Sequence, residues 1–224
     1  MNKLALFDID WTLLKPSKAH GLAFKEGFRH VYGVDTNHEG IIVHGWTDRK
    51  IIFETLRRAG LGEESIEAKL EDAMQFMSRY FAGIIDGYPL VVMPGAEELI
   101  KELYKKNVMI GVLTGNLESI AREKLKKVNL NKYFTIGCFG DISQRRADLA
   151  RKGVKEAERY HIKIQDISII GDTPLDISAG KEVGVKTIGV ATGPYAEKDL
   201  LKAEPDLVVS NLQEIDSIKK IILG

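Results

Sequence analysis

Short, almost continuously apolar runs alternate along this chain with longer segments in which apolar residues recur at helical spacing. Five of the short runs are strand candidates: Leu4–Phe7, Val108–Leu113, Ile167–Ile170, Thr187–Val190 and Leu207–Val209. Because few of their residues are polar, these strands should be covered on both faces, as the strands of parallel sheets are. Helical patterns separate them, over Glu97–Lys106, Leu117–Val128 and Arg146–Tyr160. The alternation predicts an α/β fold built on a doubly wound parallel sheet.

The region between the first two strand candidates breaks this rhythm, because it contains helical patterns only. They cover Ala19–Tyr32, Asp48–Ala59 and Ser65–Ile84. Pro16 precedes this region and Pro89 follows it, as expected where a chain leaves a sheet and returns to it. We therefore predict a small α-helical domain of residues 17–88, inserted after the first strand into a core formed by residues 1–16 and 89–224.

The charge balance argues against strong attraction to polyanions. Lys and Arg together number 32, as do Asp and Glu, so neither nucleic acid nor a membrane surface is an expected partner. The single cysteine, Cys138, is expected to be a buried thiol in a reducing compartment. No apolar run approaches the ~20 residues of a membrane span, and no signal peptide is evident. We expect a cytoplasmic protein, either a monomer or a homodimer.

Two pairs of acidic residues follow two of the strand candidates. Asp8 and Asp10 come directly after the first strand, and Asp172 and Asp176 follow the third. Open parallel sheets bind their ligands at the carboxyl ends of the strands, so the two pairs should share one site. Carboxylates this close together repel unless a cation lies between them. A hard divalent ion such as Mg²⁺ fits that position best.

The first pair has the composition that phosphoryl transfer needs. A carboxylate held against Mg²⁺ can attack phosphorus and form an aspartyl-phosphate, while a second carboxylate protonates the leaving oxygen and later activates water. The alternative is that Asp8 and Asp10 simply cap a turn, as Asp often does after a strand. For the second pair, the alternative is an ordinary helix start.

A hydroxyl residue and a glycine end the second strand candidate, in the sequence Thr114-Gly115-Asn116. A hydroxyl group together with free backbone N–H groups before a helix can hold a phosphate group. The alternative is that Thr114 or Asn116 is only the N-cap of the following helix.

In chain order, these segments resemble the signature of the haloacid dehalogenase superfamily of hydrolases: Asp8-Ile9-Asp10-Trp11-Thr12, Leu113-Thr114-Gly115-Asn116, and Gly171-Asp172 with Asp176. The resemblance implies a Rossmann-like core, with Asp8 as nucleophile and Asp10 as general acid and base. It further implies that Thr114 binds the phosphoryl group. Asp172, Asp8 and the carbonyl of Asp10 would bind Mg²⁺, and Asp176 would hold a metal-bound water.

Two positions depart from the family pattern. Trp11 stands where a glycine usually follows the second Asp, and the lysine of the third motif has no clear counterpart. Arg145, Arg146, Arg151 and Lys152 are the candidates for that cation. We favour Arg146, because an arginine at the start of this helix could bridge two anionic oxygens. The alternative is that each is a solvated cation on a basic helix face.

The helical insertion resembles the mobile cap of relatives that close over small substrates. Thr47 and Arg49 lie where such caps carry a specificity loop, and Arg49 could meet a substrate carboxylate. Alternatively, Thr47 and Asp48 cap a helix and Arg49 faces solvent. The five histidines have no metal-ligand spacing and are expected at the surface or in packing: His20, His30, His38, His44 and His161.

These features together predict a Mg²⁺-dependent phosphatase. The resemblance to phosphoglycolate phosphatase-like enzymes makes a small phosphorylated metabolite, such as 2-phosphoglycolate, the expected substrate. Asp10 favours phosphoryl chemistry over carbon–halogen cleavage, because the dehalogenase branch of the family lacks it. A phosphomutase acting on a sugar phosphate is the alternative within the enzymes. A phosphate-accepting switch that resembles a receiver domain is an alternative from another class.

Overall fold

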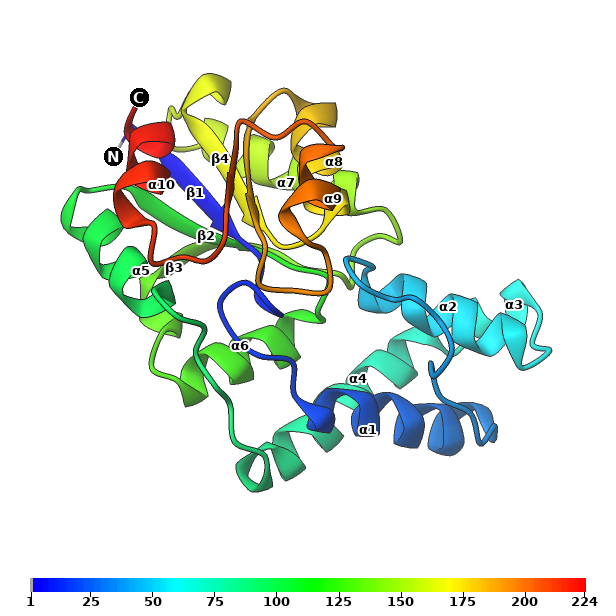
Figure 1. Cartoon of the computed structure of the whole chain (residues 1–224). Helices are drawn as coiled ribbons and strands as arrows, with labels where there is room; N and C mark the ends of the chain where they lie inside the picture. The colour runs from blue at the N-terminus through cyan, green and yellow to red at the C-terminus, as the bar shows by residue number, and fades with distance from the viewer. Residues whose placement is uncertain (1) are drawn as a thin grey trace.

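The computed structural model describes residues 2–224 and contains a six-stranded parallel sheet (Figure 1). The strands lie in the order β3-β2-β1-β4-β5-β6. Their bounds are Leu4–Phe7 (β1), Met109–Leu113 (β2), Phe134–Cys138 (β3), Ile167–Gly171 (β4), Lys186–Val190 (β5) and Leu207–Val209 (β6). The doubly wound parallel sheet that the sequence predicts is therefore confirmed.

One strand was missed by the sequence analysis. Strand β3 lies at the edge of the sheet and pairs only with β2 among the described strands. Its burial alternates, with Phe134, Ile136 and Cys138 buried and Thr135 exposed. An edge strand of this kind lacks the continuous apolar run by which the other strands were recognised. Cys138 is a buried free thiol, as expected.

Helices cover both faces of the sheet. Alternate residues of β1 point to opposite faces, so Ala5 and Phe7 join one apolar cluster and Leu4 and Leu6 join the other. The first cluster includes residues of α5 (Ala96–Lys105), α6 (Glu118–Lys127) and α10 (Ile215–Leu223). The second includes residues of α7 (Arg146–Glu158) and α8 (Pro174–Val183). The remaining short helices of the core are η3 (Asn131–Tyr133), η4 (Ile164–Asp166) and α9 (Glu197–Leu201).

The chain between β1 and α5 is helical and lies beyond the carboxyl edge of the sheet (Figure 1). Its elements are α1 (Lys18–Gly27), a π-helical turn η1 (Phe28–Tyr32), α2 (Asp48–Arg58), α3 (Glu63–Glu67), α4 (Leu70–Ile84) and η2 (Ile85–Gly87). The helix predicted over Ser65–Ile84 is thus two helices, α3 and α4. No Gly or Pro stands at the break between them, so nothing in the sequence indicates it. We call residues 18–87 the helical segment. A third apolar cluster forms within it and extends to Leu117 and to Ile120 of α6.

The two crossings between the sheet and the helical segment run side by side. The N–H of Met93 donates to the carbonyl of Leu13 at 2.9 Å, and the N–H of Lys15 donates to Val91 at 2.8 Å. Ser17 then caps α1, because its hydroxyl accepts from the N–H of Ala19. The connection is therefore a short two-stranded one, formed by residues 13–15 and 91–93.

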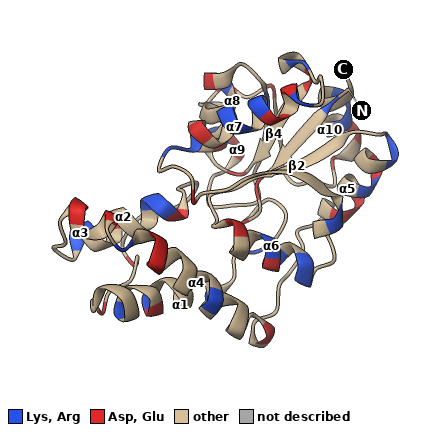
Figure 2. Cartoon of the chain, turned by 180° about the vertical axis from the view of Figure 1, so that it is seen from behind, with Lys and Arg blue, Asp and Glu red and all other residues tan. Residues whose placement is uncertain are grey.

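Acidic and basic residues are interspersed over the helices of the core and of the helical segment (Figure 2). This distribution agrees with the balanced charge of the sequence. Over residues 2–224, each helix is too short or too polar to cross a membrane.

Candidate active site

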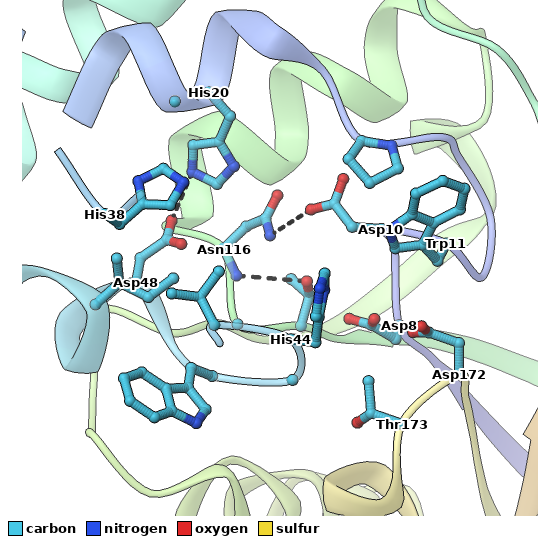
Figure 3. Close-up of a pocket in the computed structure, with 18 of the residues that line it drawn as sticks. Asp8, Asp10, Trp11, His20, His38, His44, Asp48, Asn116, Asp172 and Thr173 are labelled. Atoms are coloured by element: carbon cyan, nitrogen blue, oxygen red, sulfur yellow. Dashed lines mark hydrogen bonds and ion pairs between the residues drawn. The ribbon is translucent and has the colours of Figure 1, made fainter. Parts of the chain in front are cut away.

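The carboxyl ends of three neighbouring strands bring the predicted residues together. Asp8 follows β1, Thr114 follows β2 and Asp172 follows β4, and β1 lies between the other two strands. The chain moves from β1 to one side of the sheet and later returns to the other, so β1 and β4 flank the point where ligands of such sheets bind. A cavity of about 360 Å³ lies there, lined by the three residues and by part of the helical segment (Figure 3).

Three buried carboxylates form a cluster at one end of this cavity. Oxygen atoms of Asp8, Asp172 and Asp176 all lie within 4.8 Å of one another. Asp176 belongs to the first turn of α8, where its Oδ2 accepts from the N–H of Thr173 at 3.1 Å and from its hydroxyl at 2.7 Å. Asp176 therefore does start a helix, and its other oxygen still faces the cluster. Oδ2 of Asp172 is buried without a hydrogen-bond partner in the described chain.

Arg146 is the cation that meets this cluster. Its Nη2 lies 2.9 Å from Oδ1 of Asp8 and also pairs with Asp176. The same guanidinium donates to the carbonyls of Leu113 and Gly45, at 3.3 and 3.2 Å, so it joins the core to the helical segment. Its Nε is buried and has no partner within residues 2–224. A free donor beside Asp8 suits an anionic ligand.

The other three candidates for the third-motif cation do not belong to the residues that line this cavity. Arg145 and Arg151 both pair with Glu182 on the outside of α8. The structure thus brings Arg146, and not Arg145, Arg151 or Lys152, to Asp8.

The cluster has the charge and the donor set of a site for a divalent cation. When all three carboxylates are ionised, they and the guanidinium of Arg146 carry a formal charge of −2. Burial, and the neighbouring Asp8 and Asp176, raise the pKa of Asp172 to about 9. Burial also raises the pKa of Asp8 to about 6, against the opposing effect of Arg146. Because oxygen ligands and a net negative charge suit Mg²⁺, and Oδ2 of Asp172 has no other partner, the residues fit this ion.

These shifts predict how the stability of the metal-free protein depends on pH. Above about pH 4 the folded protein keeps protons that the unfolded chain has released, on Asp8 up to about pH 6 and on Asp172 up to about pH 9. The free energy of unfolding should therefore fall as the pH rises through this window. Urea denaturation in EDTA at several pH values measures the slope, and Asp172→Asn should flatten it. An equal slope in wild type and D172N would contradict the prediction.

Asp10 lies in the same cavity, and its carboxylate faces away from the acidic cluster. Its Oδ2 accepts from the amide of Asn116 at 2.8 Å and from Nζ of Lys124 at 2.7 Å. Burial alone would raise its pKa, but Lys124, His20 and these hydrogen bonds outweigh burial and lower it. The side chain of Asp10 is therefore paired with Lys124 and Asn116 and is not part of the acidic cluster.

The side chains of the loop after β2 do not cap the helix that follows it. Thr114 is fully buried, and its hydroxyl lies 3.4 Å from the N–H of Asn116. Neither side chain caps α6, which begins after Leu117 without a side-chain cap. A Cβ on Gly115 would lie 2.1 Å from the carbonyl oxygen of Trp46. Glycine is required here because the helical segment closes directly onto this loop.

The helical segment covers the cavity with residues other than those expected. Thr47 caps α2 by accepting from the N–H of Lys50. Arg49 pairs with Glu67 at 2.6 Å and lines a separate cavity of about 590 Å³. The structure therefore does not place Thr47 or Arg49 beside Asp8, and it agrees with the simpler alternative for Thr47.

Several residues that line or support the cavity were missed by the sequence analysis. They are His20, His38, His44, Asp48 and Lys124. His20 binds Asp48 at 3.0 Å, and Asp48 also accepts from the N–H of Leu117 at 2.8 Å. Burial, together with His20, lowers the pKa of His38. The spacing of the three histidines and Asp48 in the sequence holds no sign of this, because they meet only after the helical segment has packed on the core.

Lys124 did leave a signal in the sequence. Positions 117, 120, 121 and 125 form the apolar face of α6, and Lys124 falls on the same face at helical spacing. A lysine in an apolar stripe needs a buried partner, and that partner is Asp10.

Trp11 has a left-handed backbone, with φ of 63°. This conformation favours glycine, which accounts for the glycine of the family pattern. The turn is nevertheless well bonded here, because the carbonyl of Trp11 accepts from the hydroxyl of Thr192 at 2.5 Å and its N–H donates to Leu14 at 2.7 Å.

Comparisons with known proteins identify relatives of this chain. A model of the haloacid dehalogenase-like hydrolases matches residues 5–190. The chain is 29% identical over 220 residues to a phosphoglycolate phosphatase from Agrobacterium fabrum, covering 94% of this chain and 89% of that protein. It is 22% identical over 213 residues to the pyrophosphatase PpaX from Anoxybacillus flavithermus, covering 95% and 94%.

A solved structure of a hydrolase from Pseudomonas syringae has the same fold. It superposes with a TM-score of 0.72 at 21% identity, covering 98% of this chain and 99% of that one. The matched family segment runs from β1 to β5 and includes the acidic cluster and Arg146. The chain therefore belongs to the haloacid dehalogenase-like hydrolases.

Proposed function

We propose that this hydrolase is a Mg²⁺-dependent phosphatase that acts on a small phosphorylated metabolite. The observation that supports this most strongly is the contact of Arg146 with Asp8, inside a cluster of three buried carboxylates at the end of a covered cavity. A nucleophilic carboxylate, an anion-binding guanidinium and a fitting site for a cation are the parts that phosphoryl transfer needs.

In the first half of the reaction, a carboxylate oxygen of Asp8 attacks phosphorus and the bond from phosphorus to the leaving oxygen breaks. The leaving oxygen takes a proton from Asp10. Thr114 and the free Nε of Arg146 bind the phosphoryl oxygens. Mg²⁺ held by Asp8 and Asp172 would supply charge neutralisation for the phosphoryl group and the nucleophile.

In the second half, Asp10 takes a proton from water and the oxygen of that water attacks phosphorus. The bond to Asp8 breaks, which releases phosphate and restores the carboxylate of Asp8 and the protonated carboxyl group of Asp10. The helical segment acts in this proposal as a cap that excludes bulk water. Backbone hydrogen bonds support this role, because the N–H groups of Asp48 and Arg49 donate to the carbonyls of Gly115 and Gly140, at 2.7 and 3.2 Å.

2-Phosphoglycolate is the first candidate substrate. A cavity of about 360 Å³ has the size for a phosphorylated compound of a few carbon atoms. His38 lines it and has a buried Nδ1 without a partner in residues 2–224, which could bind a polar group of the substrate. The name of the Agrobacterium fabrum relative points to the same compound.

Phosphate release from a panel of compounds tests the proposal. The panel contains 2-phosphoglycolate, glyceraldehyde 3-phosphate, pyrophosphate, glucose 1-phosphate and p-nitrophenyl phosphate, each measured with Mg²⁺ and with EDTA. We expect Mg²⁺-dependent release from at least one small monoester. Release that is equal with Mg²⁺ and with EDTA, or equal in wild type and Asp8→Asn, would overturn the proposal. Conversion of glucose 1-phosphate to its 6-phosphate without free phosphate would instead favour a mutase.

A further inference from the structure

The ammonium group of Lys124 lies behind Asp10 and is almost completely buried, with 1% of the side chain exposed. It contacts both oxygens of Asp10, at 2.8 Å to Oδ1 and 2.7 Å to Oδ2. From this arrangement we infer that Lys124 is a positioning residue, which holds the carboxyl group of Asp10 in one orientation for its proton transfers in the reaction. The inference rests on the proposed function, because it concerns the step that Asp10 performs.

The contacts of Lys124 leave it no capacity to bind a substrate. An ammonium group has three N–H donors. Besides Asp10, Nζ contacts the amide oxygen of Asn116 at 2.6 Å and Nδ1 of His20 at 3.4 Å. All three donors are therefore occupied by protein atoms, and Lys124 is absent from the residues that line the cavity. Its effect on the reaction must pass through Asp10.

Asn116 completes a closed ring with these two residues. Its Nδ2 donates to Oδ2 of Asp10 at 2.8 Å, while its Oδ1 accepts from Lys124. Each residue of the ring comes from a different element: the turn after β1, the loop after β2, and α6. A carboxylate held by two donors from two directions has little rotational freedom, and such preorganisation favours one geometry of proton transfer.

The same ring is connected to the helical segment. His20 of α1 bonds Asp48 through Nε2 and faces Lys124 through Nδ1. Asp48 bonds the N–H of Leu117, just before α6. The position of Asp10 is thus fixed by the core and by the segment that covers the cavity, as Figure 3 shows for His20, Asp48, Asn116 and Asp10.

A purely structural role would be met more simply by another residue. Lys124 lies on the apolar face of α6, where a leucine or methionine would pack without the cost of burying a charge. The buried ion pair is instead directed at a carboxylate that keeps 22% of its side chain exposed, toward the cavity. The charge is therefore placed where it acts on a reacting group.

The decisive experiment compares leaving groups in Lys124→Met. An alkyl phosphate needs a proton on its leaving oxygen, whereas p-nitrophenolate leaves without one. We expect kcat/KM for the best alkyl phosphate of the panel to fall by about 10- to 100-fold, and kcat/KM for p-nitrophenyl phosphate by less than about 3-fold. This ratio covers only the steps up to the aspartyl-phosphate, so it leaves out the attack of water, which is common to both substrates.

Matched variants separate positioning from folding. Lys126→Met removes an exposed lysine of the same helix, which pairs only with Glu123 in the described structure, and should have wild-type kinetics. Lys124→Gln keeps a donor toward Asp10 and should recover part of the loss. In an Asp10→Asn background, Lys124→Met should lower kcat by less than about 2-fold further, because it acts through the residue already changed.

Each outcome has one meaning. An equal loss of kcat/KM for both leaving groups, or full additivity with Asp10→Asn, would overturn the inference and leave the phosphatase proposal intact. If K124M does not fold, the leaving-group comparison in K124Q decides in the same way. If wild type hydrolyses no member of the panel, the proposed function fails instead.

Discussion

Replacing Asp8 by asparagine should lower Mg²⁺-dependent phosphate release by about 10⁴-fold or more, since removal of a nucleophile leaves only binding and electrostatic effects. Asparagine has nearly the same shape as aspartate, but its amide is not a nucleophile toward phosphorus. The replacement also removes one of the three buried carboxylates of the acidic cluster. Measurement of kcat with the best substrate of the panel tests this prediction.

The control for this variant is Asp86→Asn. Asp86 is exposed on η2 and pairs with Lys127, so its replacement should leave the kinetics unchanged. Circular dichroism of D8N should match that of wild type. Retention of more than about a tenth of the wild-type kcat in D8N would contradict the role of Asp8 as nucleophile.

Replacing Arg146 by methionine should lower the free energy of unfolding in EDTA by about 3–5 kcal/mol, because it leaves buried carboxylates without their cation. Arg146 contacts both Asp8 and Asp176, and all three side chains are buried. Saturating Mg²⁺ should restore part of the loss, since binding to the folded state alone stabilises it. Urea denaturation with EDTA and with Mg²⁺ provides both values.

Arg151→Met is the matched control, because Arg151 lies on the same helix and pairs with Asp148 and Glu182 at the surface. Exposed pairs contribute about 0–1 kcal/mol, so this variant should be nearly as stable as wild type. If R146M in EDTA were as stable as R151M, the cluster would not depend on Arg146 for charge compensation.

The features that the sequence predicted are those that local patterns encode. Strands such as β1 and β4 are buried on both faces, and their apolar runs are visible without any knowledge of neighbours. Asp8 and Asp172 follow these strands directly, so the parallel sheet places them at one edge. Pro174 is the first residue of α8, a position that proline favours in helices.

The features that the sequence did not predict depend on tertiary contacts. Lys124 and Asp10 are 114 residues apart, and nothing local identifies them as partners. Arg49 has the residue type expected of a substrate-binding group, but Glu67 on α3 binds it instead. Edge strand β3 exposes Thr135 and contains Gly137, so its pattern was too weak to recognise.

The identification of Arg146 depends both on the sequence pattern and on the folded structure. The order of the motifs limited the candidates for the third-motif cation to four basic residues around the start of α7. Only the helix orientation determines which of them turns inward: Arg146 is buried at the first residue of α7, while Arg145 and Arg151 are exposed. Helical geometry thus resolves what residue type and spacing leave open.

The account depends on Asp8, Asp172 and Asp176 forming one magnesium site at which Asp8 receives the phosphoryl group. A crystal structure with Mg²⁺ and trifluoroberyllate, which mimics a phosphoryl group on a carboxylate, tests this most directly. We expect beryllium bound to a carboxylate oxygen of Asp8, and Mg²⁺ in contact with Asp8 and Asp172. Trifluoroberyllate bound elsewhere, or Mg²⁺ that contacts neither Asp8 nor Asp172, would contradict the account.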